Sequence, residues 1–289
     1  MSESEKIKFL ELALMFINSN DETLFDLGYY IIVMYSVETK DYYPLYDVSD
    51  KLLNFPIMKF LIDKGLVKTS DSIFNELNNI LIDINKVADN YYYTAKQKMM
   101  NFNFFKKDNN IMVVAPTSFG KTDLIKKYIR DNYKDKVICV LEPTKAMLNQ
   151  VRNDLLREFV GNERPKIITH HDMIFDDNDK LVFVMTQERL FKLVYDRKIS
   201  FKIDSLLVDE AHNIFEKNSR SFLLAKLIYL LRNKNNNLVV KYFSPIIQNA
   251  ENLKIKNDID SEIKQIKVIP KMKVENYFFA DFFKKKTFV

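Results

Sequence analysis

The sequence predicts an α/β protein, with a small all-α domain over residues 1–90 and a mostly parallel sheet flanked by helices over residues 91–255. Apolar residues recur at helical spacing through the first 90 residues. After residue 110, short apolar runs suited to buried strands alternate with segments of helical spacing. Polar motifs follow directly after these runs, as ligand-binding residues do at the carboxyl ends of strands in open parallel sheets. Residues 256–289 are expected to begin a linker.

The N-terminal 90 residues are expected to be helices that pack on the rest of the protein or on a partner protein. Tyr42, Tyr43 and Tyr46 could instead stack nucleic-acid bases, but the acidic balance of this region favours core packing. The boundary is expected between Asp83 and Tyr93. Two apolar stripes support the prediction: Phe9, Leu10, Leu12, Ala13, Phe16 and Ile17, and Leu24, Leu27, Gly28, Ile31 and Ile32.

The net charge of +5 conceals an asymmetry between the two parts. Residues 1–93 contain 8 Lys, no Arg and 15 acidic residues, whereas residues 94–289 contain 36 basic and 24 acidic residues. The basic excess favours binding of a polyanion such as nucleic acid to the second part. Abundant lysine can also reflect compositional bias, with the charges on solvated faces.

Residues 115–122 read Ala-Pro-Thr-Ser-Phe-Gly-Lys-Thr and have the context of a phosphate-binding loop. An apolar run over residues 111–114 predicts a strand before it, and a segment of helical spacing follows it. Backbone N–H groups in such a loop bind the β-phosphate of ATP, Lys121 reaches the β- and γ-phosphates, and Thr122 can ligate Mg²⁺. A chance Gly-Lys-Thr at a helix start is the alternative, and Ala115 in place of the usual first glycine weakens the match. The predicted ATP-binding residues here are Thr117, Ser118, Phe119, Gly120, Lys121 and Thr122.

Asp209 and Glu210 follow another apolar run, residues 205–208, which predicts a buried strand. Asp209 would hold Mg²⁺, usually through water, and Glu210 would orient and deprotonate the attacking water. Taken alone, Asp-Glu-Ala-His could be a solvated turn or a helix start. Together with the phosphate loop it predicts a nucleoside triphosphatase, with Glu210, Lys121 and Asp209 catalytic and with Thr122 and Asp209 as magnesium ligands.

Five features in this order resemble superfamily II DEAD/DEAH-box helicases over roughly residues 94–250. Besides the phosphate loop and the Asp-Glu-Ala-His tetrapeptide, residues 142–150 look like motif Ia and residues 186–190 like motif Ib. Gln97 lies where the adenine-reading glutamine of this family falls. The resemblance implies a RecA-like P-loop domain that uses ATP and Mg²⁺.

The resemblance also implies roles for single residues. Motifs Ia and Ib would contact the phosphates of one nucleic-acid strand, which gives affinity without sequence choice. Thr144 could instead belong to an ordinary helix N-cap region, and Arg189 could be an ordinary exposed helix residue. His212 and Ser244 would couple the nucleotide to motif III. The implied nucleic-acid contacts are Pro143, Thr144, Thr186 and Arg189.

Motif III departs from the family pattern, because Ser244-Pro245-Ile246 stands where the family has Ser-Ala-Thr. Proline removes an N–H group and isoleucine removes a hydroxyl, which calls into question the coupling of ATP to the nucleic-acid strand. This variant and the Ser118-Phe119 insertion are similar to helicase-like subunits of anti-phage defence systems such as Hachiman.

A second RecA-like domain with an arginine finger follows in this family, and the residues after Ser244 are too few to form it. The resemblance therefore implies a fragment of a longer enzyme, or a second RecA-like domain supplied by another chain. Alone, the chain is expected to bind ATP weakly and to hydrolyse it poorly, because an arginine finger contributes about a thousandfold or more in rate.

Composition argues against several other classes of protein. No apolar run approaches the ~20 residues that span a bilayer, and the N-terminus is acidic rather than a basic signal. The single cysteine, Cys139, cannot form an intramolecular disulfide, so the predicted location is a reducing cytoplasm. His170 and His171 lack companion ligands at metal spacing and are expected to lie in a loop after a strand.

Two functional hypotheses stay open. The first is an ATP-dependent helicase or translocase half whose hydrolysis is stimulated by nucleic acid, favoured by Glu210. The second is a nucleotide-dependent binding or switch module of a multi-subunit anti-phage complex that separates no strands, favoured by the altered motif III and the missing second domain.

Overall fold

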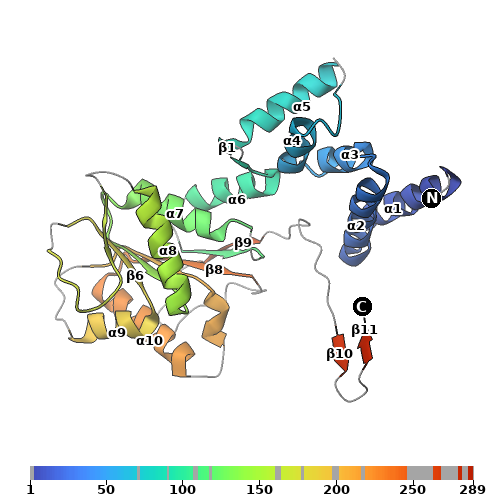
Figure 1. The fold of residues 1–289 in the computed structure, drawn as a ribbon. Coiled ribbons are helices and arrows are strands. Elements are labelled where there is room, and N and C mark those ends of the chain that lie inside the picture. Colours follow the sequence, from blue (N-terminus) through green and yellow to red (C-terminus); the bar gives the residue numbers. More distant parts are fainter. Residues whose placement is uncertain are drawn as a thin grey trace. The chain divides into compact units, whose positions relative to one another are not determined.

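The computed structural model divides into two compact units, drawn in Figure 1. The first unit is Met1–Lys98 together with Pro270–Val289, and the second is Met99–Ile269, so the units meet in sequence within a helix. The residues that the structure describes are 3–69, 72–89, 91–106, 110–116, 119–159, 164–176, 179–196, 202–215, 219–245, 263–267, 279–281 and 286–288.

The first unit is mainly helical. Helix α2 begins after Asp21, whose Oδ1 accepts hydrogen bonds from the N–H groups of Thr23 and Leu24 at 2.8 and 3.2 Å. Helices α3 and α4 each have a proline in the first turn, where its missing N–H is not needed. Buried side chains such as Ile32 and Met58 share one core. The elements are α1 (Glu3–Ile17), α2 (Glu22–Thr39), α3 (Tyr43–Lys51), α4 (Phe55–Asp63), α5 (Ile73–Ile84) and an antiparallel pair, β1 (Lys86–Ala88) with β2 (Tyr91–Tyr92).

Helices α1 and α2 approach each other closely at Gly28. A Cβ atom at this position would lie 2.8 Å from Ala13 O, from Ile17 N and from Phe16 Cβ. Gly28→Ala is therefore expected to lower the free energy of unfolding by about 1–3 kcal/mol, because two of the three obstructing atoms belong to the backbone. Thermal unfolding followed by circular dichroism measures this, with Leu27→Ala, an exposed neighbour on α2, as the matched control. Equal midpoints for the two variants would contradict the close approach.

The second unit is built on a seven-stranded sheet of order β5-β6-β4-β7-β8-β3-β9. All six neighbouring pairs are parallel. The strands are short, and β3, β4, β6 and β7 are buried along their whole length, as fully covered parallel strands are. Their bounds are β3 (Ile111–Val114), β4 (Ile138–Leu141), β5 (Lys166–Ile168), β6 (Leu181–Met185), β7 (Ser205–Val208), β8 (Val239–Ser244) and β9 (Lys264–Lys267).

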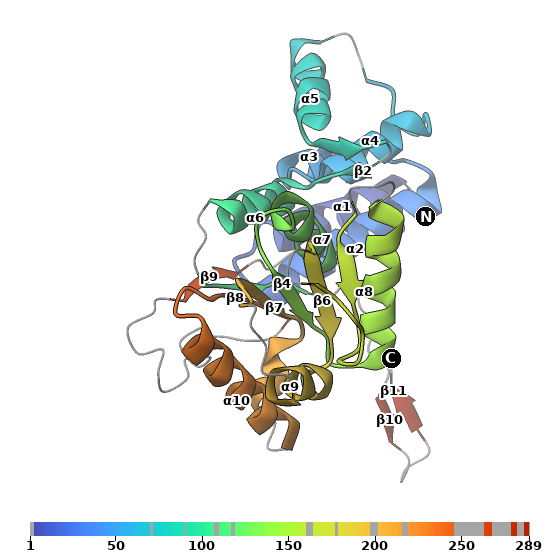
Figure 2. The same cartoon turned by 90° about the vertical axis from the view of Figure 1, so that its left-hand side faces the viewer.

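Helices cover both faces of this sheet, as Figure 2 shows for α8 on one side and for α9 and α10 on the other. Alternating residues along a strand supply the two cores: Ile138 and Val140 pack with α6, α7 and α8, whereas Cys139 and Leu141 pack with α9 and α10. The result is a three-layer α/β/α arrangement. The helices are α6 (Ala95–Phe105), α7 (Lys121–Asn132), α8 (Lys145–Glu158), α9 (Gln187–Asp196), α10 (Ser219–Lys234) and the 3₁₀ helix η1 (Ala211–Phe215).

The predicted fold class is confirmed, and β3 and β7 have the bounds expected from their apolar runs. The first unit also contains short strands beside its helices. Within residues 256–289, expected to begin a linker, β9 pairs in parallel with β3, and β10 (Phe279–Asp281) pairs antiparallel with β11 (Lys286–Phe288). In the part of the chain that the structure describes, every helix is too short or too polar to cross a lipid bilayer.

Candidate nucleotide-binding site

Four adjacent strands, in the order β4, β7, β8, β3, bring the predicted motifs to one edge of the sheet. The phosphate loop follows β3, Glu142 follows β4, Asp209 follows β7, and Ser244 ends β8. Because these strands are parallel, their carboxyl ends lie at the same edge, where open α/β sheets bind ligands.

The phosphate loop leaves β3 beside the end of β8, because Ala115 N–H donates to the Ser244 carbonyl at 3.0 Å. The Phe119 side chain is 2% exposed and belongs to the core under α7, so it anchors the loop from below. Gly120 caps α7 with a φ of 99°, a conformation that only glycine adopts readily. Thr117 and Ser118 lie outside the described residues, so their predicted contacts with ATP stay a prediction.

Lys121 is the first residue of α7 and is 7% exposed. Its Nζ donates to the Ala115 carbonyl at 2.8 Å, across the mouth of the loop. Burial lowers the pKa of the Lys121 ammonium, and the nearby carboxylates of Glu210 and Asp209 oppose this shift. Lys121 and these two acids therefore act on one another electrostatically, as the predicted site requires.

Asp209 and Glu210 leave β7 in a fixed geometry. Asp209 N–H donates to the Leu141 carbonyl at 3.0 Å, and Asp209 Oδ1 accepts from Glu210 N–H at 2.9 Å. Burial raises the pKa of Asp209. Glu210 has a φ of 47°, an uncommon conformation for a residue with a side chain, of the kind found at functional sites. His212 Nδ1 lies 3.2 Å from Glu210 Oε2.

Glu142 is a third carboxyl group at this edge, and sequence reasoning missed it. Its side chain is 2% exposed, and among the residues that the structure describes neither carboxyl oxygen has a hydrogen-bond partner. Burial, together with the charges of Asp209 and Glu210, raises the pKa of Glu142 to about 9. Glu142 lines a cavity of about 420 Å³ with Thr144, Asp209, Glu210 and other residues. In the sequence, Glu142 is the first residue of the segment that looks like motif Ia, but its closeness to the acidic pair depends on β4 lying next to β7.

Motif Ia supplies a helix N-terminus at the same edge. Thr144 is the N-cap of α8, and its Oγ1 accepts from Met147 N–H at 3.2 Å. Thr186 precedes α9 after the neighbouring strand β6, and its carbonyl accepts from Leu190 N–H at 3.0 Å. Arg189 Nη1 donates to the Thr169 carbonyl at 2.8 Å. Two helix N-termini thus begin at adjacent strand ends, where backbone N–H groups can bind phosphate.

Arg220, at the start of α10, connects motif Ia to α9. Its Nη2 donates to the Pro143 carbonyl at 2.6 Å, and its Nε lies 2.7 Å from Glu188 Oε1. No signal in the sequence identifies Arg220, because its partners are far from it along the chain.

Comparison with known proteins identifies the family. The sequence model of the DEAD/DEAH box helicase family matches residues 94–247, more than half of this chain. The chain belongs to this family. The match ends close to the expected limit of the resemblance, and that prediction is confirmed.

One relative of this helicase domain is anti-bacteriophage protein B of Escherichia coli K12, 28% identical over 134 residues. The alignment covers 46% of this chain and 17% of the relative, so the chain spans less than a fifth of that protein's length. Three solved structures are also similar, with 17%, 18% and 20% identity and TM-scores of 0.45, 0.47 and 0.46. They are the Hef helicase domain of Pyrococcus furiosus, a hypothetical ATP-dependent RNA helicase of Sulfolobus tokodaii and a DEAD box protein of Methanococcus jannaschii. The alignments cover 59%, 62% and 70% of this chain and 37%, 54% and 54% of those chains.

Two of the predicted site residues, Gln97 and Ser244, make hydrogen bonds that stabilise the fold of the helicase domain. Gln97 Oε1 accepts from Thr94 N–H at 2.9 Å, and Gln97 N–H donates to Thr94 Oγ1 at 3.2 Å, which is a capping box at the start of α6. Ser244 is fully buried and holds the entry of the phosphate loop through its carbonyl. The adenine-reading role of Gln97 and the coupling roles of Ser244 and His212 stay predictions. Ile246 lies outside the described residues.

Proposed function

We propose that this chain is the ATP-binding half of an ATP-dependent helicase or translocase, which hydrolyses ATP with Mg²⁺ and contacts a nucleic-acid backbone. The observation that carries the proposal is the grouping of Lys121, Asp209 and Glu210 at one sheet edge, with their charges acting on one another. A buried ammonium opposite two carboxyl groups suits a substrate with polyphosphate and a divalent cation.

The residues present fit a magnesium ion. The carboxyl groups of Asp209, Glu210 and Glu142 lie close together, and burial and neighbouring carboxylate charge raise the pKa of Asp209 and of Glu142. A bound cation would offset this repulsion. Asp209 and the Thr122 hydroxyl are the oxygen ligands in this proposal, since Mg²⁺ prefers oxygen. An ion held there would neutralise negative charge on the phosphates of the nucleotide.

The protein's own groups then have separate tasks. Lys121 exchanges its hydrogen bond with the Ala115 carbonyl for one with phosphate, so little reorganisation is needed. The N-terminus of α7 offers backbone N–H groups to the same phosphates. Glu210 accepts the proton of the attacking water, and its strained backbone aims the carboxylate independently of the regular strand.

Nucleic acid would lie against the N-termini of α8 and α9. Thr144 and Thr186 begin these helices, and Pro143 is tied to α10 through Arg220. Arg189 has further N–H groups for phosphate beyond the one that Thr169 accepts. Such contacts are to the nucleic-acid backbone, so they determine neither the sequence that is bound nor the polarity of movement.

Protein partners form part of the same proposal. A second RecA-like domain, in cis or in trans, would supply the arginine finger. On the first unit, α5 exposes an apolar face of the kind that partner proteins cover, made of Ile73, Phe74, Leu77, Ile80, Leu81 and Ile84. A reducing cytoplasm fits the single cysteine, Cys139, which is free and buried.

A switch module of an anti-phage complex is the second candidate. Pro245 directly after β8 and the similarity to anti-bacteriophage protein B favour it. In this case ATP occupancy would change contacts with a partner protein, and the protein would not move along or separate nucleic-acid strands.

Steady-state ATP hydrolysis distinguishes the two candidates. It is measured with and without single-stranded DNA or RNA, on this chain alone and on the chain supplied with its second RecA-like domain. Turnover stimulated by nucleic acid only when that domain is present is the expected result. Nucleotide binding without stimulation in either case would support the switch module, and absence of nucleotide binding would reject both.

A further inference from the structure

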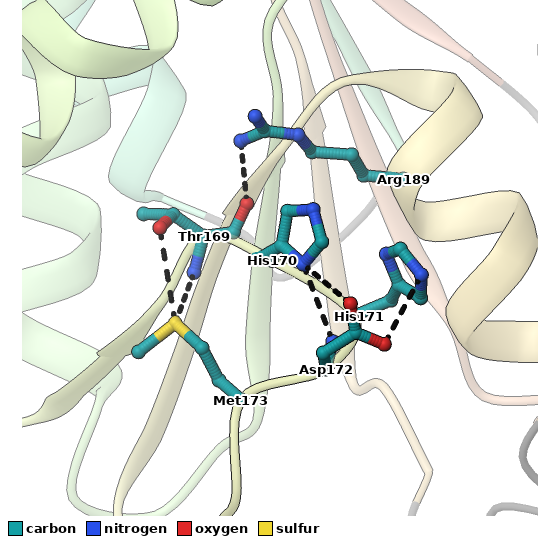
Figure 3. Close-up of polar contacts among 6 residues, drawn as sticks. All are labelled: Thr169, His170, His171, Asp172, Met173 and Arg189. Atoms are coloured by element: carbon teal, nitrogen blue, oxygen red, sulfur yellow. Dashed lines mark hydrogen bonds and ion pairs between the residues drawn. The ribbon is translucent and has the colours of Figure 1, made fainter.

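A second cluster of ligand-bearing side chains lies in the turn after β5, made of His170, His171 and Asp172, as Figure 3 shows. His170 Nδ1 lies 3.1 Å from Asp172 Oδ2, and His171 Nε2 lies 3.2 Å from Asp172 Oδ1. The ligand atoms of all three residues lie within 4.8 Å of one another. Asp172 thus places a carboxylate beside both imidazoles.

The turn is held in shape by groups outside this cluster. Thr169 N–H donates to Met173 Sδ at 3.4 Å, and Met173 N–H donates to the His170 carbonyl at 3.3 Å. Arg189 Nη1 donates to the Thr169 carbonyl, so α9 fixes the start of the turn. The backbone that presents the three side chains is therefore held in part by contacts with Met173 and Arg189.

The contacts of His170 favour a cation at this place. Its Nδ1 accepts from Asp172 N–H at 3.5 Å, so the lone pair of Nδ1 points to the same residue whose carboxylate lies 3.1 Å away. Nδ1 cannot accept from that N–H and donate to the carboxylate at the same time. Two electron-pair donors at this spacing are stabilised by a cation that both can bind.

We propose that His170 Nδ1, His171 Nε2 and Asp172 bind one divalent transition-metal ion, with Zn²⁺ the best fit. Bonds of about 2.1 Å in a tetrahedral site place ligand atoms about 3.4 Å apart, close to the two separations in the turn. Two imidazoles and one carboxylate suit Zn²⁺, Co²⁺ or Ni²⁺, whereas Mg²⁺ and Ca²⁺ prefer oxygen alone. Asp172 is 73% exposed, so an ion can enter and water can complete the coordination.

This site is separate from the proposed magnesium site. Strand β5, which precedes the turn, lies two strands away from β4, with β6 between them, and β4 is the neighbour of β7. Asp209 of the proposed magnesium site follows β7. Three strand spacings correspond to about 14 Å. The ion would clamp the turn whose Thr169 carbonyl holds Arg189, so its role would be structural.

The composition of the chain allows a sharp test, because it contains three histidines and one cysteine. Tag-free protein, stripped of metal by a chelator, is titrated with Co²⁺ and followed by visible absorption, with Zn²⁺ competition giving the zinc affinity. One equivalent with tetrahedral absorption bands is expected. His171→Ala should weaken binding by about a hundredfold or more, and His212→Ala, the matched control, should keep the one equivalent.

A second variant and a second readout guard against misfolding. Asp172→Asn changes an exposed side chain and should also lose the Co²⁺ bands, while circular dichroism matches the parent. Zn²⁺ should raise the thermal midpoint of the parent and not that of Asp172→Asn. Absent Co²⁺ bands, or equal binding by the parent and His171→Ala, would overturn the proposal.

Discussion

Glu210→Gln is expected to slow ATP hydrolysis by about a hundredfold or more while ATP affinity stays within about threefold of the parent. Glutamine keeps the size and the hydrogen-bonding oxygen of Glu210 but cannot accept the proton of the attacking water. In the proposed complex the phosphates are held by Lys121 and by the N-terminus of α7, so binding of ATP depends little on the Glu210 carboxylate. Single-turnover hydrolysis with excess protein and titration of a fluorescent ATP analogue measure the two quantities separately.

Two further variants make this result specific. Lys121→Ala should weaken both ATP binding and hydrolysis, because Lys121 contacts the phosphates in the proposed complex. Glu11→Gln, on the exposed surface of α1, removes a carboxylate in the same way and should hydrolyse ATP like the parent. If Glu210→Gln hydrolyses ATP at the parent's rate, Glu210 is not the base.

Glu142→Gln is expected to stabilise the protein increasingly as the pH rises. The pKa of Glu142 is raised from 4.5 to about 9, so the folded state keeps the proton that the unfolded state releases. The resulting stability is fully present below about pH 4.5 and is lost as the pH rises toward 9, at about 1.4 kcal/mol per pH unit. At neutral pH the free energy of unfolding of the parent should therefore have fallen by about 3 kcal/mol relative to its value at low pH, whereas that of the variant should not show this fall.

Urea unfolding of both proteins between about pH 5 and pH 8, without nucleotide and with a chelator present, measures this difference. A buried glutamine amide without partners lowers the free energy of unfolding by an amount that does not depend on pH. The diagnostic quantity is therefore how the difference in free energy of unfolding between the two proteins changes with pH, and not the difference at one pH. Glu142→Met, which removes the polar group, should give the same slope. A difference that does not change with pH would show that Glu142 is ionised in the folded protein.

Much of the second unit could be predicted because its signals are local. The apolar runs at residues 111–114 and 205–208 each form a strand with those bounds. The motif that follows each run in sequence therefore lies at the carboxyl end of a strand. Glu142 and Arg220 could not be found in this way. Their importance arises from the order of strands and from contacts between α10 and motif Ia, which no window of sequence contains.

The proposed metal cluster shows a different limit of sequence reasoning. Its three ligands are consecutive residues, a spacing that neither helix nor strand would bring together on one side. Only the turn after β5, closed by Met173 and Arg189, directs them to one point. Turn geometry of this kind depends on distant partners.

Strand β8 lies between β3 and β7 and so separates the strand that carries the phosphate loop from the strand that carries the acids. Two strand spacings are about 10 Å, a width set by backbone hydrogen bonds and not by side chains. Substitutions within β8 can therefore alter the polarity of the surface between the Lys121 ammonium and the carboxylates of Asp209 and Glu210. They would not change the distance between the two strands that carry these groups.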